Sequence, residues 1–138
     1  MKFTVLNKIK AIRYKPQGTA ILISITDPAS GNPPFHGTYE GIIRLQFHDI
    51  NEQFPEGYFF EGVLFNSDDA KDILAFVKNH PDIDEIVVHC EAGVSRSAGV
   101  AAALSKIYLE DDTEFFGLCY IPNRLVYNTI LNQHYLKD

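Results

Sequence analysis

The chain has few cysteines, few basic residues and no long apolar run, and each shortage excludes a class of protein. Two cysteines among 138 residues cannot form the disulfide framework of a small secreted domain. The formal net charge of -6 argues against broad binding to nucleic acid or to anionic membranes. No apolar segment approaches membrane-spanning length, and the N-terminus lacks a signal-peptide pattern. We therefore expect a cytoplasmic protein with no nucleic acid and no membrane among its partners.

The sequence also lacks any feature that would divide it into parts. No internal repeat, low-complexity tract or linker-like segment interrupts the chain. Its hydrophobic content of 46% and charged content of 22% are typical of a globular protein, and the chain is long enough to bury a core. We expect one domain spanning residues 1–138, and we expect it to be monomeric.

One segment that the sequence does contain, residues 85–99, is typical of an anion-binding loop. Residues 85–89 form a β-branched run that predicts a buried strand, and the small and aliphatic residues of 95–109 predict a helix. Between them lies a turn with Cys90 at its start and Arg96 at its end. Backbone N–H groups in such a turn point inward, and the helix N-terminus adds partial positive charge. Gly93 suits the point where the loop needs a backbone angle that a side chain would oppose.

A cysteine and an arginine in this arrangement are suited to phosphoryl transfer. At a helix N-terminus and beside Arg96, Cys90 is expected to act as a nucleophilic thiolate. The planar guanidinium of Arg96 can hold two phosphoryl oxygens and stabilise the charge of the transition state. The hydroxyl of Ser97 can hydrogen-bond the sulfur and ease its departure from a phosphoenzyme. We expect His89 to order the loop through hydrogen bonds rather than to act as a base.

The run from His89 to Ser97 resembles the signature of the cysteine-dependent protein tyrosine phosphatases. Its form here, Cys-Glu-Ala-Gly-Val-Ser-Arg-Ser-Ala over residues 90–98, is most similar to the dual-specificity branch, and the chain resembles small bacterial or phage-type members of it. The alternative is a strand that ends in a core cysteine with Arg96 on a helix surface, but the motif and its strand–helix context agree. The resemblance implies that the phosphoryl group is held by Arg96 and by loop residues Glu91, Ala92, Gly93, Val94 and Ser95.

The same resemblance implies an α/β fold in a single domain. It has a central mixed sheet of four or five strands flanked by helices, with the phosphate-binding loop between a strand and a helix. The order of elements predicted from the apolar patterns is consistent with this fold. These patterns predict strands over 2–6, 20–25, 41–48 and 85–89, and helices over 8–14, from an N-cap at Ser67 to His80, over 95–109, and from Pro122 onward.

Phosphoryl transfer to a thiolate also requires an acid that protonates the leaving oxygen. Asp49 directly follows an alternating strand pattern, and the resemblance implies this role for an aspartate just past a strand and upstream of the cysteine. Once ionised, the same carboxylate can activate the water that hydrolyses the phosphocysteine. In the alternative interpretation Asp49 only begins a turn with Asn51, and His48 is then the next candidate for the acid.

Three other features are open to a functional or a structural interpretation. The aromatic-rich segment 51–65 can wall a pocket, but core packing is the simpler account for most of its rings. Cys119 can in principle form a disulfide with an oxidised Cys90, although a buried apolar cysteine is the better interpretation. The acidic run 110–112 is expected to be a solvated turn, and we expect no metal and no cofactor.

These observations predict a metal-independent phosphatase that acts through a phosphocysteine. The expected partners are a phosphorylated protein or peptide as substrate and a phosphate or sulfate ion in the active site. Phosphotyrosine is the expected target. Acceptance of phosphoserine and phosphothreonine depends on the depth of the pocket, which the composition does not determine.

Alternatives from other classes remain open at this point. The same loop serves phosphatases of inositol phosphates and of RNA 5′-phosphates, but Glu91 and Val94 replace lysines and the chain is acidic. A rhodanese-type sulfurtransferase also uses a loop cysteine, although the arginine–serine ending fits phosphate better. A catalytically silent phosphate-binding module is the non-enzymatic alternative, and the intact Cys90 and Arg96 count against it.

Overall fold

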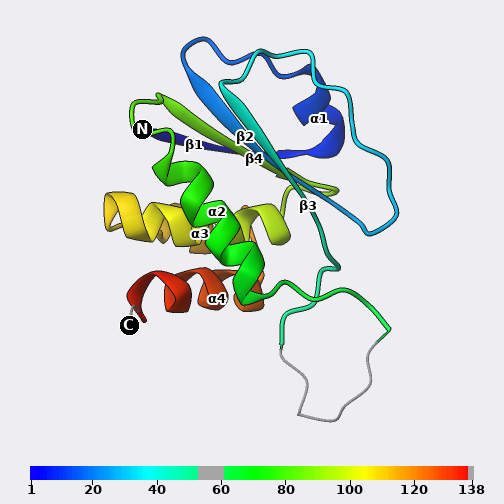
Figure 1. Cartoon of the computed structure of the whole chain (residues 1–138), viewed down its shortest axis with the longest axis vertical. Coiled ribbons are helices and arrows are strands. Elements are labelled where there is room, and N and C mark those ends of the chain that lie inside the picture. Colours follow the sequence, from blue (N-terminus) through cyan, green and yellow to red (C-terminus); the bar gives the residue numbers. More distant parts are fainter. Residues whose placement is uncertain (53–60, 137–138) are drawn as a thin grey trace.

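A four-stranded parallel sheet forms the centre of the molecule, with helices on both faces (Figure 1). The computed structural model describes residues 1–52 and 61–136. The strands lie in the order β1–β4–β2–β3. Their bounds are Lys2–Asn7 for β1, Ala20–Thr26 for β2, Gly41–Gln46 for β3 and Glu85–Cys90 for β4. The helices are α1 (Lys8–Arg13), α2 (Ser67–Lys78), α3 (Arg96–Leu109) and α4 (Arg124–Tyr135), with a short 3-10 helix, η1, at Thr113–Phe116.

The apolar patterns of the strands match their places in the sheet. Every residue of the central strands β2 and β4 is buried, as parallel strands covered on both faces require. The edge strand β3 alternates: Leu45 is buried, while Arg44 and Gln46 are exposed. Strands β1 and β3 form the two edges of the sheet, and the alternating pattern predicted before Asp49 is confirmed.

Helices α2, α3 and α4 lie on one face of the sheet, and α1 lies on the other together with the loop 27–40 (Figure 1). Helix α3 contacts both the sheet and α4, and all of its residues from Arg96 to Ser105 are buried. Gly99 lies where α3 meets the start of α4, and a Cβ there would come within 2.7 Å of the Asn123 backbone oxygen. This close approach brings the N-terminus of α4 to the loop of residues 91–95 between β4 and α3. We call this loop the phosphate loop after its predicted role.

The α/β class and the number of strands are confirmed, but the sheet is not mixed. All strand pairs among the described residues are parallel. The reason is that each connection between successive strands is long enough to return the chain to the same end of the sheet, through α1, the loop 27–40 or α2. The carboxyl ends of all four strands therefore lie at the same end of the sheet. The phosphate loop follows β4 at that end.

Two helices begin at residues other than those predicted. Helix α2 is capped by Asn66 rather than Ser67, because Asn66 Oδ1 accepts from the Asp69 N–H at 3.0 Å and the Asp69 carboxylate accepts in return from the Asn66 N–H. Helix α4 begins after Asn123, not at Pro122, because Asn123 Oδ1 accepts from the Val126 N–H at 3.0 Å. In both cases an asparagine next to the predicted start supplies the capping acceptor.

Cys119 is exposed, so its interpretation as a buried apolar residue is wrong. It lies in the irregular segment between η1 and α4 rather than on a helix face that packs on the core. Of the aromatic segment 51–65, Phe65 is buried and packs edge-to-face on Phe47 with ring centroids 4.9 Å apart. The aromatic residues between 53 and 60 lie outside the described residues. None of the helices in the described ranges is long and apolar enough to cross a membrane.

Candidate active site

The phosphate loop joins the end of β4 to the start of α3 and rests on the end of β1. Gly93, in the middle of the loop, has a φ of +71°, which L side chains rarely adopt. A Cβ at this position would lie 2.6 Å from the Asn7 nitrogen and 2.7 Å from the Leu6 carbonyl carbon. The prediction of a glycine-dependent turn is confirmed, and the reason is both the backbone angle and the contact with β1.

Cys90 presents a buried sulfur that is surrounded by donors. Its Sγ lies 3.0 Å from the Ser97 hydroxyl and accepts a hydrogen bond from the Gly93 N–H at 3.3 Å. The residue is only 2% exposed. These contacts fix the position of the sulfur at the start of the loop. The arrangement is therefore suited to a nucleophilic sulfur.

His89 supports the loop from beneath. Its Nδ1 lies 3.2 Å from the Cys90 carbonyl oxygen, and its Nε2 lies 2.6 Å from the Ser24 hydroxyl. A carbonyl oxygen only accepts, so Nδ1 carries the proton and the Ser24 hydroxyl donates to Nε2. Burial lowers the pKa of His89, which favours this neutral form. These contacts fit a loop-ordering residue and leave no free ring nitrogen for a base.

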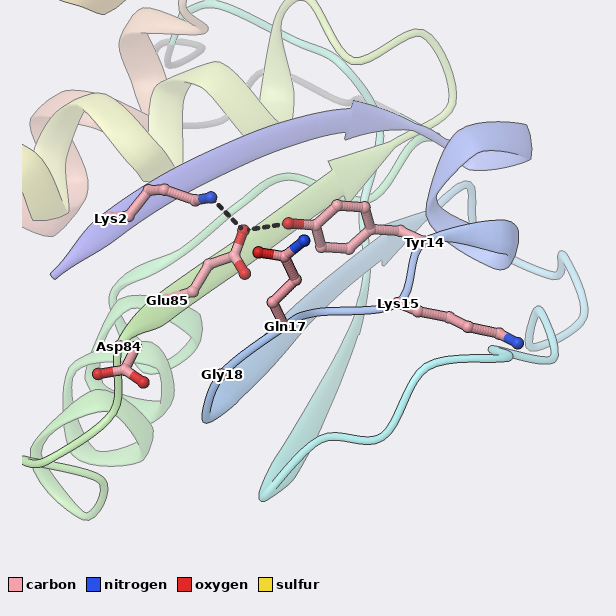
Figure 2. A pocket seen from close by; sticks show the side chains of 7 residues that line it. All are labelled: Lys2, Tyr14, Lys15, Gln17, Gly18, Asp84 and Glu85. Atoms are coloured by element: carbon pink, nitrogen blue, oxygen red, sulfur yellow. Dashed lines mark hydrogen bonds and ion pairs between the residues drawn. The ribbon is translucent and has the colours of Figure 1, made fainter.

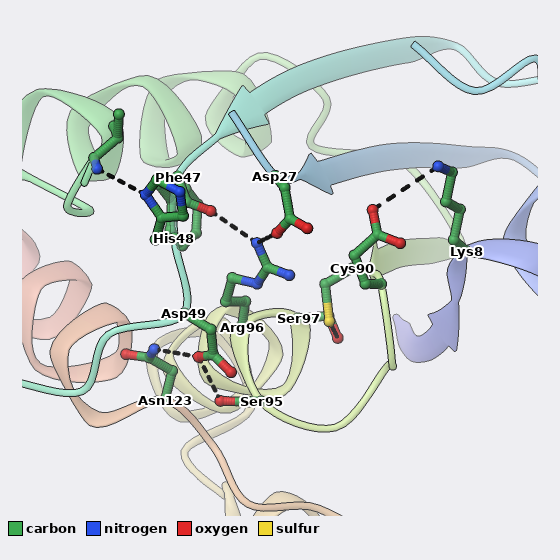
Figure 3. Close-up of polar contacts among 12 residues, drawn as sticks. Lys8, Asp27, Phe47, His48, Asp49, Cys90, Ser95, Arg96, Ser97 and Asn123 are labelled. Carbon is green, nitrogen blue, oxygen red and sulfur yellow. Dashed lines mark hydrogen bonds and ion pairs between the residues drawn. The ribbon is translucent and has the colours of Figure 1, made fainter. Parts of the chain in front are cut away.

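Arg96 is held on one side by two acceptors that the sequence did not reveal. Its Nη1 donates to the Asp27 carboxylate and to the Phe47 carbonyl, both at 2.7 Å, and the residue is 6% exposed (Figure 3). The two hydrogens of Nη1 serve these contacts, which leaves the edge formed by Nε and Nη2 for an anion. Two parallel N–H groups on one edge match two phosphoryl oxygens. Asp27 directly follows β2, the neighbour of β4, so strand order was the signal that could have identified it.

Asp49 lies against the phosphate loop. Its Oδ1 accepts from the Ser95 hydroxyl at 2.8 Å and from the Asn123 side-chain amide at 2.7 Å (Figure 3). The same amide of Asn123 donates to the Ile50 carbonyl at 3.0 Å. Because both contacts engage Oδ1, Oδ2 is the oxygen left to exchange a proton with a bound molecule. Asn123 was not identified from the sequence, because it is distant in the chain and its role depends on how α4 packs.

His48 occupies a different position from Asp49. Its ring Nδ1 accepts from the Val63 N–H at 2.8 Å, and the backbone N–H of His48 donates to the Val63 carbonyl at 2.8 Å. The ring is thus held by the segment that leads into α2. Of the two acids considered from the sequence, Asp49 is the one that contacts the phosphate loop.

The remaining loop residues are fixed from two sides. The Lys8 N–H donates to the Glu91 carbonyl at 3.2 Å, and the Lys8 ammonium lies 3.9 Å from the Glu91 carboxylate. On the other side, the Ile121 N–H donates to the Val94 carbonyl at 3.0 Å and the Asn123 N–H donates to the Ser95 carbonyl at 2.9 Å. Ala92 is exposed. The loop is therefore preformed by its neighbours at the start of α1 and before α4.

A second cleft, of about 420 Å³, lies at the opposite end of β4 (Figure 2). At its floor the Glu85 carboxylate accepts from the hydroxyls of Thr4 and Tyr14 and lies 3.8 Å from the Lys2 ammonium. Burial, together with Glu85, raises the pKa of Tyr14. Glu85 and Cys90 are at the two ends of one strand, roughly 17 Å apart at about 3.3 Å per residue. This cleft is separate from the phosphate loop.

Comparison with known proteins supports the fold alone. No family model matches the chain, and no curated protein sequence matches it. Among solved structures, the crystal structure of the human tyrosine phosphatase-like serine/threonine/tyrosine-interacting protein superposes with a TM-score of 0.66. The two are 15% identical, and the match covers 97% of this chain and 91% of that one. The chain thus has a tyrosine-phosphatase-like fold over nearly its whole length.

Proposed function

We propose that this chain is a cysteine-dependent phosphatase that hydrolyses phosphotyrosine in protein substrates through a phosphocysteine intermediate. The observation that carries the proposal is the hydrogen bond between Ser95 and Asp49. It joins an acid from the end of β3 to the loop that bears Cys90 and Arg96. A nucleophile, an anion-binding group and an acid in one site are what phosphoryl transfer to a thiol requires.

In the first step, the Cys90 thiolate attacks phosphorus and the bond to the leaving oxygen breaks. Arg96, through its Nε–Nη2 edge, and the backbone amides of the loop hold the three other phosphoryl oxygens. Asp49 transfers a proton from Oδ2 to the leaving oxygen, so the alcohol departs neutral. The products of this step are the free alcohol, the phosphocysteine and an ionised Asp49.

In the second step, water attacks phosphorus and the phosphorus–sulfur bond breaks. Asp49 accepts a proton from the water and so returns to its starting form. The Ser97 hydroxyl, 3.0 Å from Sγ, donates to the sulfur as it departs as thiolate. Inorganic phosphate leaves from the loop, and no metal takes part in either step.

The charges around the loop favour a protein substrate over a polyphosphorylated small molecule. The Glu91 carboxylate takes up the Lys8 ammonium, and Asp27 takes up part of the charge of Arg96. A substrate with several phosphates would meet carboxylates where it needs unpaired cations. Phosphotyrosine is the primary substrate in this proposal, and phosphoserine and phosphothreonine enter only if the pocket is shallow.

A catalytic thiolate also requires a reducing compartment. Cys90 would be oxidised readily outside a reducing compartment, and the exposed Cys119 would be open to disulfide exchange. We therefore assign the protein to the cytoplasm. We also propose that it is a monomer with one catalytic domain over residues 1–138.

The test is hydrolysis of phenyl phosphate, whose poor leaving group depends on an acid, in the presence of a chelator. Cys90→Ser should abolish turnover, and Asp49→Asn should lower kcat by roughly two to three orders of magnitude. His48→Asn, the matched control, should keep wild-type activity within about twofold, a small change compared with the effect of losing an acid. Equal activity of Asp49→Asn and wild type would move the acid elsewhere. A wild type that binds phosphate without turnover would leave a silent binding module.

A further inference from the structure

Three large apolar side chains are exposed within residues 116–121, a stretch whose backbone hydrogen-bonds to the phosphate loop. Large apolar side chains gathered on a protein surface mark binding sites more often than chance. In the segment between η1 and α4, Leu118 is fully exposed and Ile121 is 73% exposed, and Phe116, the last residue of η1, is 42% exposed. We call these three residues the apolar rim. The chemistry proposed above uses none of them.

The apolar rim is joined to the phosphate loop through its own backbone. The Ile121 N–H donates to the Val94 carbonyl at 3.0 Å, and two residues later the Asn123 N–H donates to the Ser95 carbonyl at 2.9 Å. Val94 and Ser95 both belong to the loop. The segment that carries Ile121 therefore runs directly beside the loop that would hold the phosphoryl group.

The position of Asp49 determines on which side the rest of a substrate leaves the loop. An acid that protonates the leaving oxygen must lie next to it, and that oxygen connects the phosphoryl group to the remainder of the substrate. Asp49 accepts a hydrogen bond from the Asn123 side chain at 2.7 Å, and Asn123 lies two residues after Ile121 of the apolar rim. The body of a substrate that leaves the loop beside Asp49 therefore passes close to the segment that carries Ile121 and Leu118.

We propose that the apolar rim is a docking surface for the polypeptide around the phosphorylated residue, and that it takes apolar side chains next to that residue. The inference rests on the proposed function, because it uses the direction of the leaving group. Burial of Leu118 and Ile121 against apolar substrate side chains supplies binding energy that a small aryl phosphate cannot obtain. The rim would therefore select phosphoproteins by local sequence.

Two other occupants fit the observations less well. A second copy of this chain on the rim would cover the side from which the substrate enters, and so would oppose turnover. An anionic membrane surface would be repelled by the net charge of -6. A phosphorylated polypeptide uses the rim and the loop at the same time.

The experiment compares two phosphotyrosine peptides that differ only beside the phosphotyrosine, one with leucines and one with serines. For wild type, the ratio of kcat/KM for the leucine peptide to kcat/KM for the serine peptide should be about five to ten. The double variant Leu118→Ser, Ile121→Ser should lose this ratio. Leu109→Ser is the matched control, because Leu109 is 47% exposed at the far end of α3, roughly 20 Å along the helix. It should keep the ratio.

A second measurement separates the docking surface from the proposed chemistry. The Cys90→Ser variant should bind the fluorophore-labelled leucine peptide more tightly than the serine peptide. This preference should be lost in the triple variant Cys90→Ser, Leu118→Ser, Ile121→Ser. If wild type turns over neither peptide but this preference persists, the proposed function fails and the docking surface stands. Turnover of both peptides at equal kcat/KM by wild type would overturn the docking surface alone.

A second copy of the chain or a membrane on the apolar rim would each give a different experimental result. Dimerisation in sedimentation that the double variant abolishes, with the peptide ratio unchanged, would assign the rim to a second copy. Binding to phosphatidylcholine–phosphatidylserine vesicles that the double variant loses, with the peptide ratio unchanged, would assign it to a membrane. Either result would contradict the proposal.

Discussion

Gly93 is the residue at which the phosphate loop touches the end of β1. Alanine there would combine a left-handed backbone angle with a Cβ 2.6 Å from the Asn7 nitrogen. We expect Gly93→Ala to lower the free energy of unfolding by about 2–4 kcal/mol, the sum of backbone strain and overpacking. Urea denaturation measures this change. Gly31→Ala is the control, because a Cβ at Gly31 meets nothing within 4 Å, and similar losses in the two variants would contradict the role of the contact.

Asp27 is the partner that determines which edge of Arg96 faces the anion. Asparagine keeps the shape and the acceptor oxygen but removes the charge that holds Nη1 at 2.7 Å. Since the guanidinium would then be held less firmly, by the Phe47 carbonyl and a neutral amide oxygen, we expect Asp27→Asn to weaken inhibition by inorganic phosphate about tenfold, the effect of losing one well-placed charged hydrogen bond. The inhibition constant against para-nitrophenyl phosphate is the measurement. The exposed Asp82→Asn should leave it unchanged, and equal constants in all three proteins would reject the positioning role.

Among the helices, α4 contributes to the site through its first turn. Asn123 caps the helix with Oδ1 and holds Asp49 with its amide. Asn123→Asp would keep the cap and remove the donor to Asp49. We expect kcat to fall at least about tenfold for phenyl phosphate and much less for para-nitrophenyl phosphate, because a good leaving group needs less help from an acid.

The leaving-group comparison separates positioning from folding. The same substitution at the cap of α2, Asn66→Asp, should reduce both rates little and equally, since that cap contacts only its own helix. A parallel loss on both esters in Asn123→Asp would mean that the substitution disturbs the loop as a whole.

The contrast between these residues shows what the sequence can reveal. The strand–loop–helix segment 85–109 was predictable, because β-branched residues, a glycine and small helical residues act locally. The cap of α2 was missed by one residue because Asn66 and Ser67 can both serve as caps. The cap Asn123 was missed because the proline before it also favours a helix start. Asp27 and Asn123 were not assigned to the site because their contacts depend on which strands and helices become neighbours. Cys119 was misjudged because its segment belongs to no periodic element.

At the scale of the whole molecule, the parallel sheet concentrates the polar groups at one edge. Asp27 follows β2, Asp49 lies just past β3, and Cys90 ends β4. In α/β folds, ligands bind outside the carboxyl ends of the strands, where the following loops converge. The arrangement explains how three segments far apart in the chain bring together the carboxylate that holds Arg96 and the two residues to which we assign the roles of acid and nucleophile. An antiparallel strand in place of β2 or β3 would have sent its residue to the opposite edge.

The most direct test of the account is whether the phosphoryl group is transferred to Cys90. Ser97→Ala removes the donor to the departing sulfur, so the second step should slow and the intermediate should accumulate. The variant would be mixed with excess para-nitrophenyl phosphate, quenched in acid and analysed by peptide mass spectrometry. We predict a burst of one nitrophenolate per chain and one phosphoryl group on the peptide that contains Cys90. Continued turnover without a phosphorylated Cys90 would contradict the phosphocysteine mechanism.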